Sequence, residues 1–259
     1  MTNYEDKSAT ENVEGSEKKE RIAKRLSRAG ICSRRAAERL IEEGRVKLNG
    51  QVLDTPATLV GDKDKIAVDG KIVGESPETA VWRYHKPTGL VTSNADEKGR
   101  MTIFDDLPKD FPRVMTVGRL DMNTEGLLLL TNDGELARHL EKPDTGWIRR
   151  YRVRVFGHVD EAQLKSLKRG VTIEGIRYKS IEAALDKDRS EGTNRWLTVG
   201  LSEGKNREIR IVMEHLGLQV SRLIRLSYGP FQLGNLPRGQ IEPIKKHVLK
   251  AALGKTFEL

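Results

Sequence analysis

The longest uncharged apolar run in the chain consists of four leucines, Leu127–Leu130. Four residues fall far short of the about 20 that cross a bilayer, and the amino terminus has no apolar segment typical of a secretion signal. A short run of this kind is typical of a buried strand. We therefore expect a globular protein that neither enters a membrane nor is secreted.

Composition indicates the cellular compartment of the protein and the charge of its partner. The single cysteine, Cys32, excludes an internal disulfide and a cysteine-based zinc site, as expected in the reducing cytoplasm. Lys and Arg outnumber Asp and Glu by 46 to 38, which gives a net charge of +8. This surplus favours an anionic partner, although composition alone does not choose between nucleic acid and an anionic membrane.

Charge and turn signals divide the 259 residues. Residues 1–20 carry six acidic and three basic side chains with almost no aliphatic residue, so we expect a disordered acidic tail. Residues 73–79, which include glycine, serine and proline, are expected to be a linker. The predicted domains are therefore 21–72 and 80–254.

Two short helices and a hairpin are expected in the first domain. Apolar residues recur at helical spacing around Leu26 and again around Leu40, and Ser33 stands where the second helix needs an N-cap. Asn49-Gly50 between apolar residues predicts a two-residue hairpin turn. A further strand is expected at 65–68, followed by a turn at Asp69-Gly70.

The second domain is predicted to be α+β with a mixed, mostly antiparallel sheet, because its strands often follow one another without an intervening helix. The expected strands are 80–84, 114–117, 127–131, 149–156, 177–185, 195–201 and 219–227. The expected helices are 134–141, 160–168, 206–216 and 243–253.

Nine basic and three acidic residues crowd into 21–47. Arg34 and Arg35 directly follow Ser33, so two guanidinium groups and the free amides of a helix start would converge, as phosphate binding requires. The alternative is a solvated helix face. The run from Gly30 to Ala37, with Gly44-Arg45-Val46 and Asn49-Gly50, resembles the small RNA-binding domain first described in ribosomal protein S4. The resemblance implies structured RNA as the partner.

A solitary acid, Asp121, stands just before the leucine run. From these residues alone it is either a turn residue or a functional carboxylate. The whole run Gly118–Gly134, however, resembles the signature of the bacterial ribosomal-RNA pseudouridine synthases of the RsuA and RluB type. The segments Lys86–Val91, Arg150–Val153 and Gly204–Arg210 agree with the same family, so the resemblance covers residues 21–250.

This resemblance implies that a uridine in RNA is detached from its ribose, rotated and rejoined through carbon, with Asp121 as the attacking carboxylate and no cofactor. It implies that Arg210 pairs with Asp121 and that Tyr151 lies against the target base. Tyr151 could instead be a core aromatic residue. Arg119 would fill the space of the flipped nucleotide or hold phosphate, or form a surface ion pair. The further substrate-binding residues that it implies are Lys86, Lys205, Arg207, Arg34 and Arg35.

The sequence does not predict a metal site, because the five histidines never form the i,i+4 pair of a helical zinc site.

The expected partner is ribosomal RNA or a ribosomal assembly intermediate, and the protein is expected to be a cytoplasmic monomer. The segment Leu223–Pro230 resembles the large-subunit branch more than the small-subunit one. The rival hypothesis, a non-catalytic RNA-binding or assembly factor, leaves the Asp121 segment unexplained.

Overall fold

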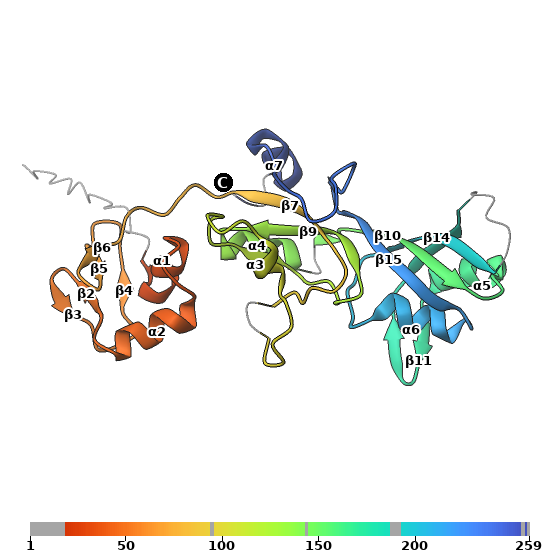
Figure 1. The fold of residues 1–259 in the computed structure, drawn as a ribbon, viewed down its shortest axis with the longest axis horizontal. Helices are drawn as coiled ribbons and strands as arrows, with labels where there is room; N and C mark the ends of the chain where they lie inside the picture. The colour runs from red at the N-terminus through yellow and green to blue at the C-terminus, as the bar shows by residue number, and fades with distance from the viewer. Residues whose placement is uncertain (1–18, 94–95, 143–144, 187–192, 255–256, 258–259) are drawn as a thin grey trace, which may run out of the picture. The chain divides into compact units, whose positions relative to one another are not determined.

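Two units make up the chain and divide between Pro77 and Glu78, inside the segment 73–79. They are described by a computed structural model, which covers residues 19–93, 96–142, 145–186, 193–254 and 257 (Figure 1). No helix within these ranges is long and apolar enough to cross a membrane.

The first unit packs two helices, α1 (Ile22–Arg28) and α2 (Arg34–Glu42), on short strands. As predicted, the Ser33 hydroxyl caps α2 by accepting the Ala36 amide at 3.1 Å. The predicted turns at Asn49-Gly50 and Asp69-Gly70 both have positive φ at both residues, as type I′ hairpin turns require. The strands are β1 (Glu20–Arg21), β2 (Val46–Leu48), β3 (Gln51–Val52), β4 (Leu59–Val60), β5 (Ile66–Val68) and β6 (Lys71–Ile72).

The predicted disordered tail, residues 1–20, extends too far toward the first domain. Glu20 lies in β1 and pairs with Val60 of β4, because β1 adds an antiparallel partner to an edge that the sequence pattern did not reveal. The Glu20 carboxylate also meets Lys24, Arg25 and Arg28 within 3.8 Å. Residues 1–18 of the expected tail lie outside the described residues.

The second unit is built on a nine-stranded sheet in the order β13-β14-β10-β15-β9-β7-β17, with β16 paired to β15 and β8 to β9. Every pairing is antiparallel except that of β15 with β9. The α+β prediction with a mostly antiparallel sheet is thus confirmed. The strands are β7 (Val81–Lys86), β8 (Met115–Val117), β9 (Glu125–Thr131), β10 (Arg149–Phe156), β13 (Ile181–Leu185), β14 (Asn194–Leu201), β15 (Gln219–Tyr228), β16 (Phe231–Gln232) and β17 (Ile241–Pro243).

Helices cover both faces of this sheet. The remaining elements are α3 (Ile103–Asp106), α4 (Gly134–Glu141), α5 (Glu161–Ser166), the 3-10 turn η2 (Leu167–Arg169), the ribbon β11 (Val171–Ile173) and β12 (Ile176–Tyr178), α6 (Glu208–His215) and α7 (Lys246–Leu253).

The predicted helix 134–141 and the predicted strand 149–156 are confirmed at both ends. The strand expected over 177–185 is wrong, because the chain leaves β12 after Tyr178 and enters β13 only at Ile181, pairing with a different neighbour.

Strand β9 is buried along its whole length, as the leucine run predicts. Leu127 and Leu129 pack in a cluster with α4 and α7, whereas Leu128 and Leu130 belong to the larger cluster that includes α3. A strand that is apolar on both faces can occupy only such a central position. The residues just before β9 are therefore fixed in space by the core.

Gly126 lets β9 approach β15. Its φ is +106°, and a Cβ atom at this position would lie 2.3 Å from the carbonyl oxygen of Arg225, its parallel partner. Only a residue without a side chain fits this contact, because both the conformation and the clash exclude a Cβ.

We predict that Gly126→Ala lowers the free energy of unfolding of the second unit by about 2–5 kcal/mol, because backbone strain and overpacking add. Urea unfolding followed by tryptophan fluorescence measures this change. Gly204→Ala is the matched control, since Gly204 lies in the same unit and its Cβ would meet nothing within 4 Å, and we expect a change within about 0.5 kcal/mol. Equal stability of the two variants would contradict the steric argument.

Candidate active site

The loop from Gly118 to Thr124 joins β8 to β9 and carries Asp121. Backbone bonds define its shape: the Thr124 amide donates to the Asp121 carbonyl at 3.0 Å, and the Gly89 amide donates to the Met122 carbonyl at 2.8 Å. The Thr92 hydroxyl donates to the Leu120 carbonyl at 2.8 Å. Asp121 is therefore presented by a turn whose ends are both tied to the segment after β7.

Lys86, the last residue of β7, forms hydrogen bonds to the backbone of this loop. Its side chain is fully buried, and Nζ donates to the carbonyls of Pro87, Asp121 and Thr124 at 3.0, 3.2 and 3.0 Å, with Met122 at 3.5 Å. Burial lowers the pKa of Lys86 to about 8, although nearby carboxylates oppose the shift. The prediction that Lys86 contacts substrate is corrected: an ammonium buried among carbonyl groups positions the loop and cannot reach RNA.

A cavity of about 890 Å³ opens in front of Asp121. Arg119, Tyr151, Lys205 and Arg207 also line it, so the structure brings these predicted residues together from three separate segments. Asp121 is partly buried, and among the described residues its carboxylate forms no hydrogen bond or ion pair. The carboxylate is thus available to a ligand in the cavity.

Tyr151 lies in β10, on the wall of the cavity. Its residue is 9% exposed, and a register irregularity between Arg150 and Tyr151 separates it from the regular ladder with β15. A bulge of this kind re-aims a side chain and is frequent beside active sites. Tyr151 belongs to the larger core cluster and also lines the cavity.

Two arginines that the sequence did not single out flank Tyr228 at the cavity. The Arg149 guanidinium lies 4.6 Å from the Tyr228 ring centroid, and that of Arg225 lies 5.2 Å from it. Arg225 is buried and donates from Nε to the Leu127 carbonyl at 2.7 Å. The signal that could have revealed it is a charged residue at an inward position of the strand that begins at Gln219.

Several buried polar atoms around the cavity have no hydrogen-bond partner among the described residues: Thr124 Oγ1, Glu208 Oε1 and Arg225 Nη2. Unsatisfied buried groups are uncommon in folded proteins and concentrate where a ligand or a water completes the site.

The segment Lys205–Arg207 is held by two carboxylates. Lys205 forms an ion pair with Glu203, and the Glu208 carboxylate accepts the Lys205 amide at 2.9 Å. Burial raises the pKa of Glu208 to about 7, and the Glu203 charge adds to the shift. Arg207 has a left-handed backbone with φ +52° and an exposed side chain. Lys205 is thus partly neutralised, whereas Arg207 extends over the cavity.

Arg210 does not form the expected ion pair with Asp121. Its guanidinium donates to the Asn123 carbonyl at 2.9 Å and to the Val220 carbonyl at 3.3 Å, so it holds the loop two residues beyond Asp121. The Asp121 charge still acts on Arg210, because it raises the pKa of Arg210 against the larger lowering effect of burial. Arg119 is exposed at the cavity and forms no ion pair in the described part of the chain, which removes the surface-pair alternative.

Arg34 and Arg35 lie in the first unit, at the start of α2, and both are exposed. Neither forms an ion pair within the described ranges, whereas Arg45 pairs with Asp69 at 2.7 Å. Histidine, cysteine and acidic side chains nowhere gather in threes suited to a metal in those ranges.

Comparison with known families matches residues 80–215 to the RNA pseudouridylate synthase family and residues 20–66 to the S4 domain. The chain belongs to the RNA pseudouridine synthase family. It is therefore an isomerase that acts on RNA, and its first unit is an S4 domain.

Relatives support this assignment over nearly the full chain. An uncharacterized RNA pseudouridine synthase of Rickettsia felis is 45% identical over 231 residues, 89% of this chain and 99% of the relative. Ribosomal large subunit pseudouridine synthase B of Salmonella typhi is 46% identical, over 85% of this chain and 77% of its own. A crystal structure of a pseudouridylate synthase shares the fold, with a TM-score of 0.61 and 24% identity over 89% of this chain and 98% of its own.

Glu208 gives this synthase a pH-dependent stability. Because its pKa is raised from 4.5 to about 7, its stabilising contribution is complete below pH 4.5 and is lost as the pH rises through about 7. Glu208→Gln mimics the protonated side chain at every pH. We predict that the free energy of unfolding of the variant rises relative to that of the parent by about 1–2 kcal/mol as the pH goes from 5 to 8. This figure allows for solvent screening. Urea unfolding across this range measures the difference, and a constant difference would contradict the prediction.

Proposed function

We propose that this synthase converts a specific uridine of large-subunit ribosomal RNA to pseudouridine, with Asp121 as the nucleophile. The observation that carries the proposal is the Asp121 carboxylate, unpaired among the described residues, at the wall of a cavity of about 890 Å³ lined by basic side chains. The large-subunit target is supported by the name of the Salmonella typhi relative and by its 46% identity.

In this mechanism the target base leaves the RNA stack and enters the cavity, because chemistry on a base requires access to it. Asp121 attacks to form a covalent intermediate, and the bond between ribose C1′ and uracil N1 breaks. The uracil rotates and its carbon C5 bonds to C1′, which releases the Asp121 carboxylate. The proton on C5 is then removed, and N1 carries a proton in the product. The atoms of uridine and pseudouridine are the same, so the isomerisation consumes no cofactor. The Lys86 contacts keep the carboxylate aimed while the base turns.

Three further residues have proposed roles. The Tyr151 ring lies against the uracil and its hydroxyl takes part in proton removal. Arg210, through its bond to the Asn123 carbonyl, fixes the loop and supplies positive charge near the Asp121 carboxylate. Arg119, exposed beside Asp121, fills the space of the flipped nucleotide or holds a phosphate.

RNA binding is distributed over the two units. Lys205 and Arg207 contact the RNA backbone at the cavity, and Arg34 and Arg35 bind phosphate at the start of α2. The substrate is free ribosomal RNA or an assembly intermediate, and the protein acts as a monomer in the cytoplasm. Conversion of uridine separates this proposal from a non-catalytic assembly factor, and mapping the product separates large-subunit from small-subunit RNA.

Asp121→Asn tests the nucleophile. The variant keeps the size of the side chain but removes its charge, so we expect RNA affinity to change by less than about twofold while conversion falls at least about a thousandfold, or about 4 kcal/mol of barrier. Single-turnover conversion of uridine in ribosomal RNA is the measurement. Asp110→Asn removes an exposed charge elsewhere on the same unit and should convert like the parent. Conversion by Asp121→Asn within about tenfold of the parent would exclude Asp121 as the nucleophile.

The combined variant Arg34→Gln/Arg35→Gln tests the S4 domain. Loss of two phosphate contacts should weaken binding to ribosomal RNA and reduce the slope of log affinity against log salt by roughly 1 to 2. Filter binding across a salt series measures both. The matched control, Lys109→Gln/Lys165→Gln, removes two exposed charges away from the cavity. If both double variants have the slope of the parent, these two arginines do not bind phosphate.

A further inference from the structure

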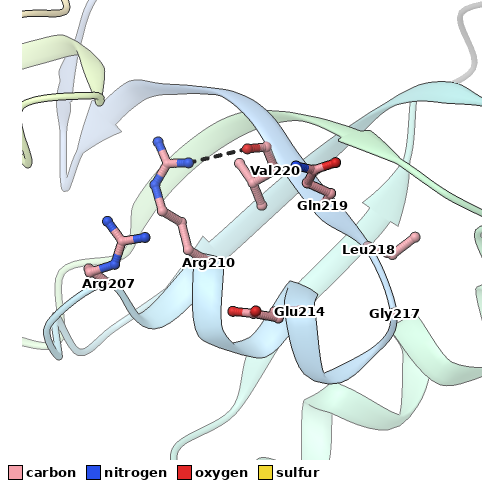
Figure 2. Close-up of a pocket in the computed structure, with 7 residues that line it drawn as sticks. All are labelled: Arg207, Arg210, Glu214, Gly217, Leu218, Gln219 and Val220. Atoms are coloured by element: carbon pink, nitrogen blue, oxygen red, sulfur yellow. Dashed lines mark hydrogen bonds between the residues drawn. The ribbon is translucent and has the colours of Figure 1, made fainter.

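A second cavity, of about 530 Å³, lies beside α6 and is separate from the one in front of Asp121 (Figure 2). We call it the α6 groove. Its volume falls within the about 300–1,000 Å³ range of pockets for small ligands. One wall is a single face of α6 and its flanking residues, because Arg207, Arg210, Glu214 and Gly217 recur at helical spacing. The opposite wall is the start of β15 around Val220.

The groove runs for about 15 Å along the helix, since ten residues separate Arg207 from Gly217 at about 1.5 Å each. Gly217 lies two residues beyond the end of α6, and its φ of +73° turns the backbone sharply. A Cβ there would meet nothing within 4 Å, so this end of the groove is open. Val220, which is partly exposed, contributes apolar surface between the two ends, whereas Leu218 is buried in the core beneath the lining. An elongated, partly apolar groove of this length suits a nucleotide rather than a compact ion.

Positive charge collects at one end of the groove, where Figure 2 shows the side chains of Arg207 and Arg210 on the same side of the helix. Burial and the Arg207 charge both lower the pKa of Arg210. The Arg210 Nε atom is buried without a hydrogen-bond partner among the described residues. The positive charges of Arg207 and Arg210 repel each other, and Arg210 has an unsatisfied hydrogen-bond donor. An anion such as a phosphate would stabilise both.

The other part of the groove has the opposite polarity. Glu214 is exposed, lies one helical turn beyond Arg210, and forms no ion pair in the described part of the chain. Gln219, which is also exposed, lies on the β15 side. A carboxylate repels phosphate but accepts hydrogen bonds from base amino groups, and an amide both donates and accepts. This end therefore suits the edge of a base.

The groove is connected to the active site. Arg207 lines both cavities, and Arg210 links the groove to the Asp121 loop through its bonds to the Val220 and Asn123 carbonyls. An RNA strand that places its target uridine at Asp121 would thus continue past Arg207 into the groove.

We propose that the α6 groove binds a nucleotide next to the target uridine, with its phosphate at Arg207 and Arg210 and its base at Glu214 and Gln219. The groove selects a base that presents an amino group, namely adenine, cytosine or guanine. Uracil is disfavoured, because two carbonyl oxygens flank its single N–H and face the Glu214 carboxylate. This inference rests on the proposed function and adds a determinant of substrate choice to it.

The test uses the full-length protein and transcribed ribosomal RNA. The target uridine is first mapped by treating unmodified ribosomal RNA with the parent. Fragments that carry this uridine are then prepared with each of the four bases at either flanking position, and kcat/KM is measured for each. We expect the parent to prefer an amino-bearing base over uracil by about tenfold at one of the two positions, the discrimination expected of a good side-chain contact to a base.

Glu214→Gln should reduce this preference to about twofold, since an amide accepts and donates equally well, while the rate on the preferred fragment at saturation stays within about twofold. Gln219→Ala is the second variant and should lower the preference in the same direction. Glu161→Gln, on α5 and outside both cavities, is the charge-matched control and should keep the preference of the parent.

The outcomes separate the two proposals. If the parent converts no uridine in ribosomal RNA, the proposed function is wrong and this inference is wrong with it. If the parent converts a uridine but discriminates no flanking base, or if both groove variants keep its discrimination, the groove inference alone is overturned.

Discussion

The buried ammonium of Lys86 is the interaction on which the site depends. Removing a cation from water is costly unless its donors are satisfied, and here backbone carbonyls from both ends of one loop surround it. The Asp121 carbonyl, which already accepts the Thr124 amide within the turn, accepts a second hydrogen bond from Lys86. One side chain at the end of β7 therefore ties together the two ends of the turn that carries Asp121.

The core reinforces this arrangement from the other side of the loop. Strand β9 starts immediately after Thr124 and is buried throughout, so the loop cannot shift along the strand without exposing leucines to water. Glu125, also buried, forms ion pairs with Arg222 and Arg238 and anchors the first residue of the strand. By contrast, Arg119 and Arg207 are exposed, so packing constrains their side chains least.

The parallel contact between β9 and β15 brings the parts of the site together. It places Arg225 opposite Gly126, and β10, which carries Tyr151, pairs along the other edge of β15. Helix α6 leads directly into β15, so Lys205, Arg207 and Arg210 reach the same region from the helix side. Residues far apart in the chain meet because one strand is shared by all of these contacts.

The sequence by itself determined the elements that depend on local physics. The Ser33 cap, the hairpin turns at Asn49-Gly50 and Asp69-Gly70, the buried strand after Asp121 and the limits of α4 and β10 follow from side-chain chemistry, special backbone conformations and apolar periodicity. The signature around Asp121 likewise indicates the enzyme family without any three-dimensional contact. These features need no knowledge of which segments meet.

The tertiary structure decided every property that depends on a partner distant in the chain. Strand β1 was missed because a two-residue strand is stable only against its neighbour β4. Lys86 has the sequence context of a binding residue, yet it is buried because β7 ends beneath the Asp121 loop. Arg210 donates to the Asn123 carbonyl instead of pairing with the Asp121 carboxylate. Arg225 lies at the site only because β15 pairs with β9. Burial and pairing are properties of three-dimensional neighbours, so residue type and spacing could not specify them.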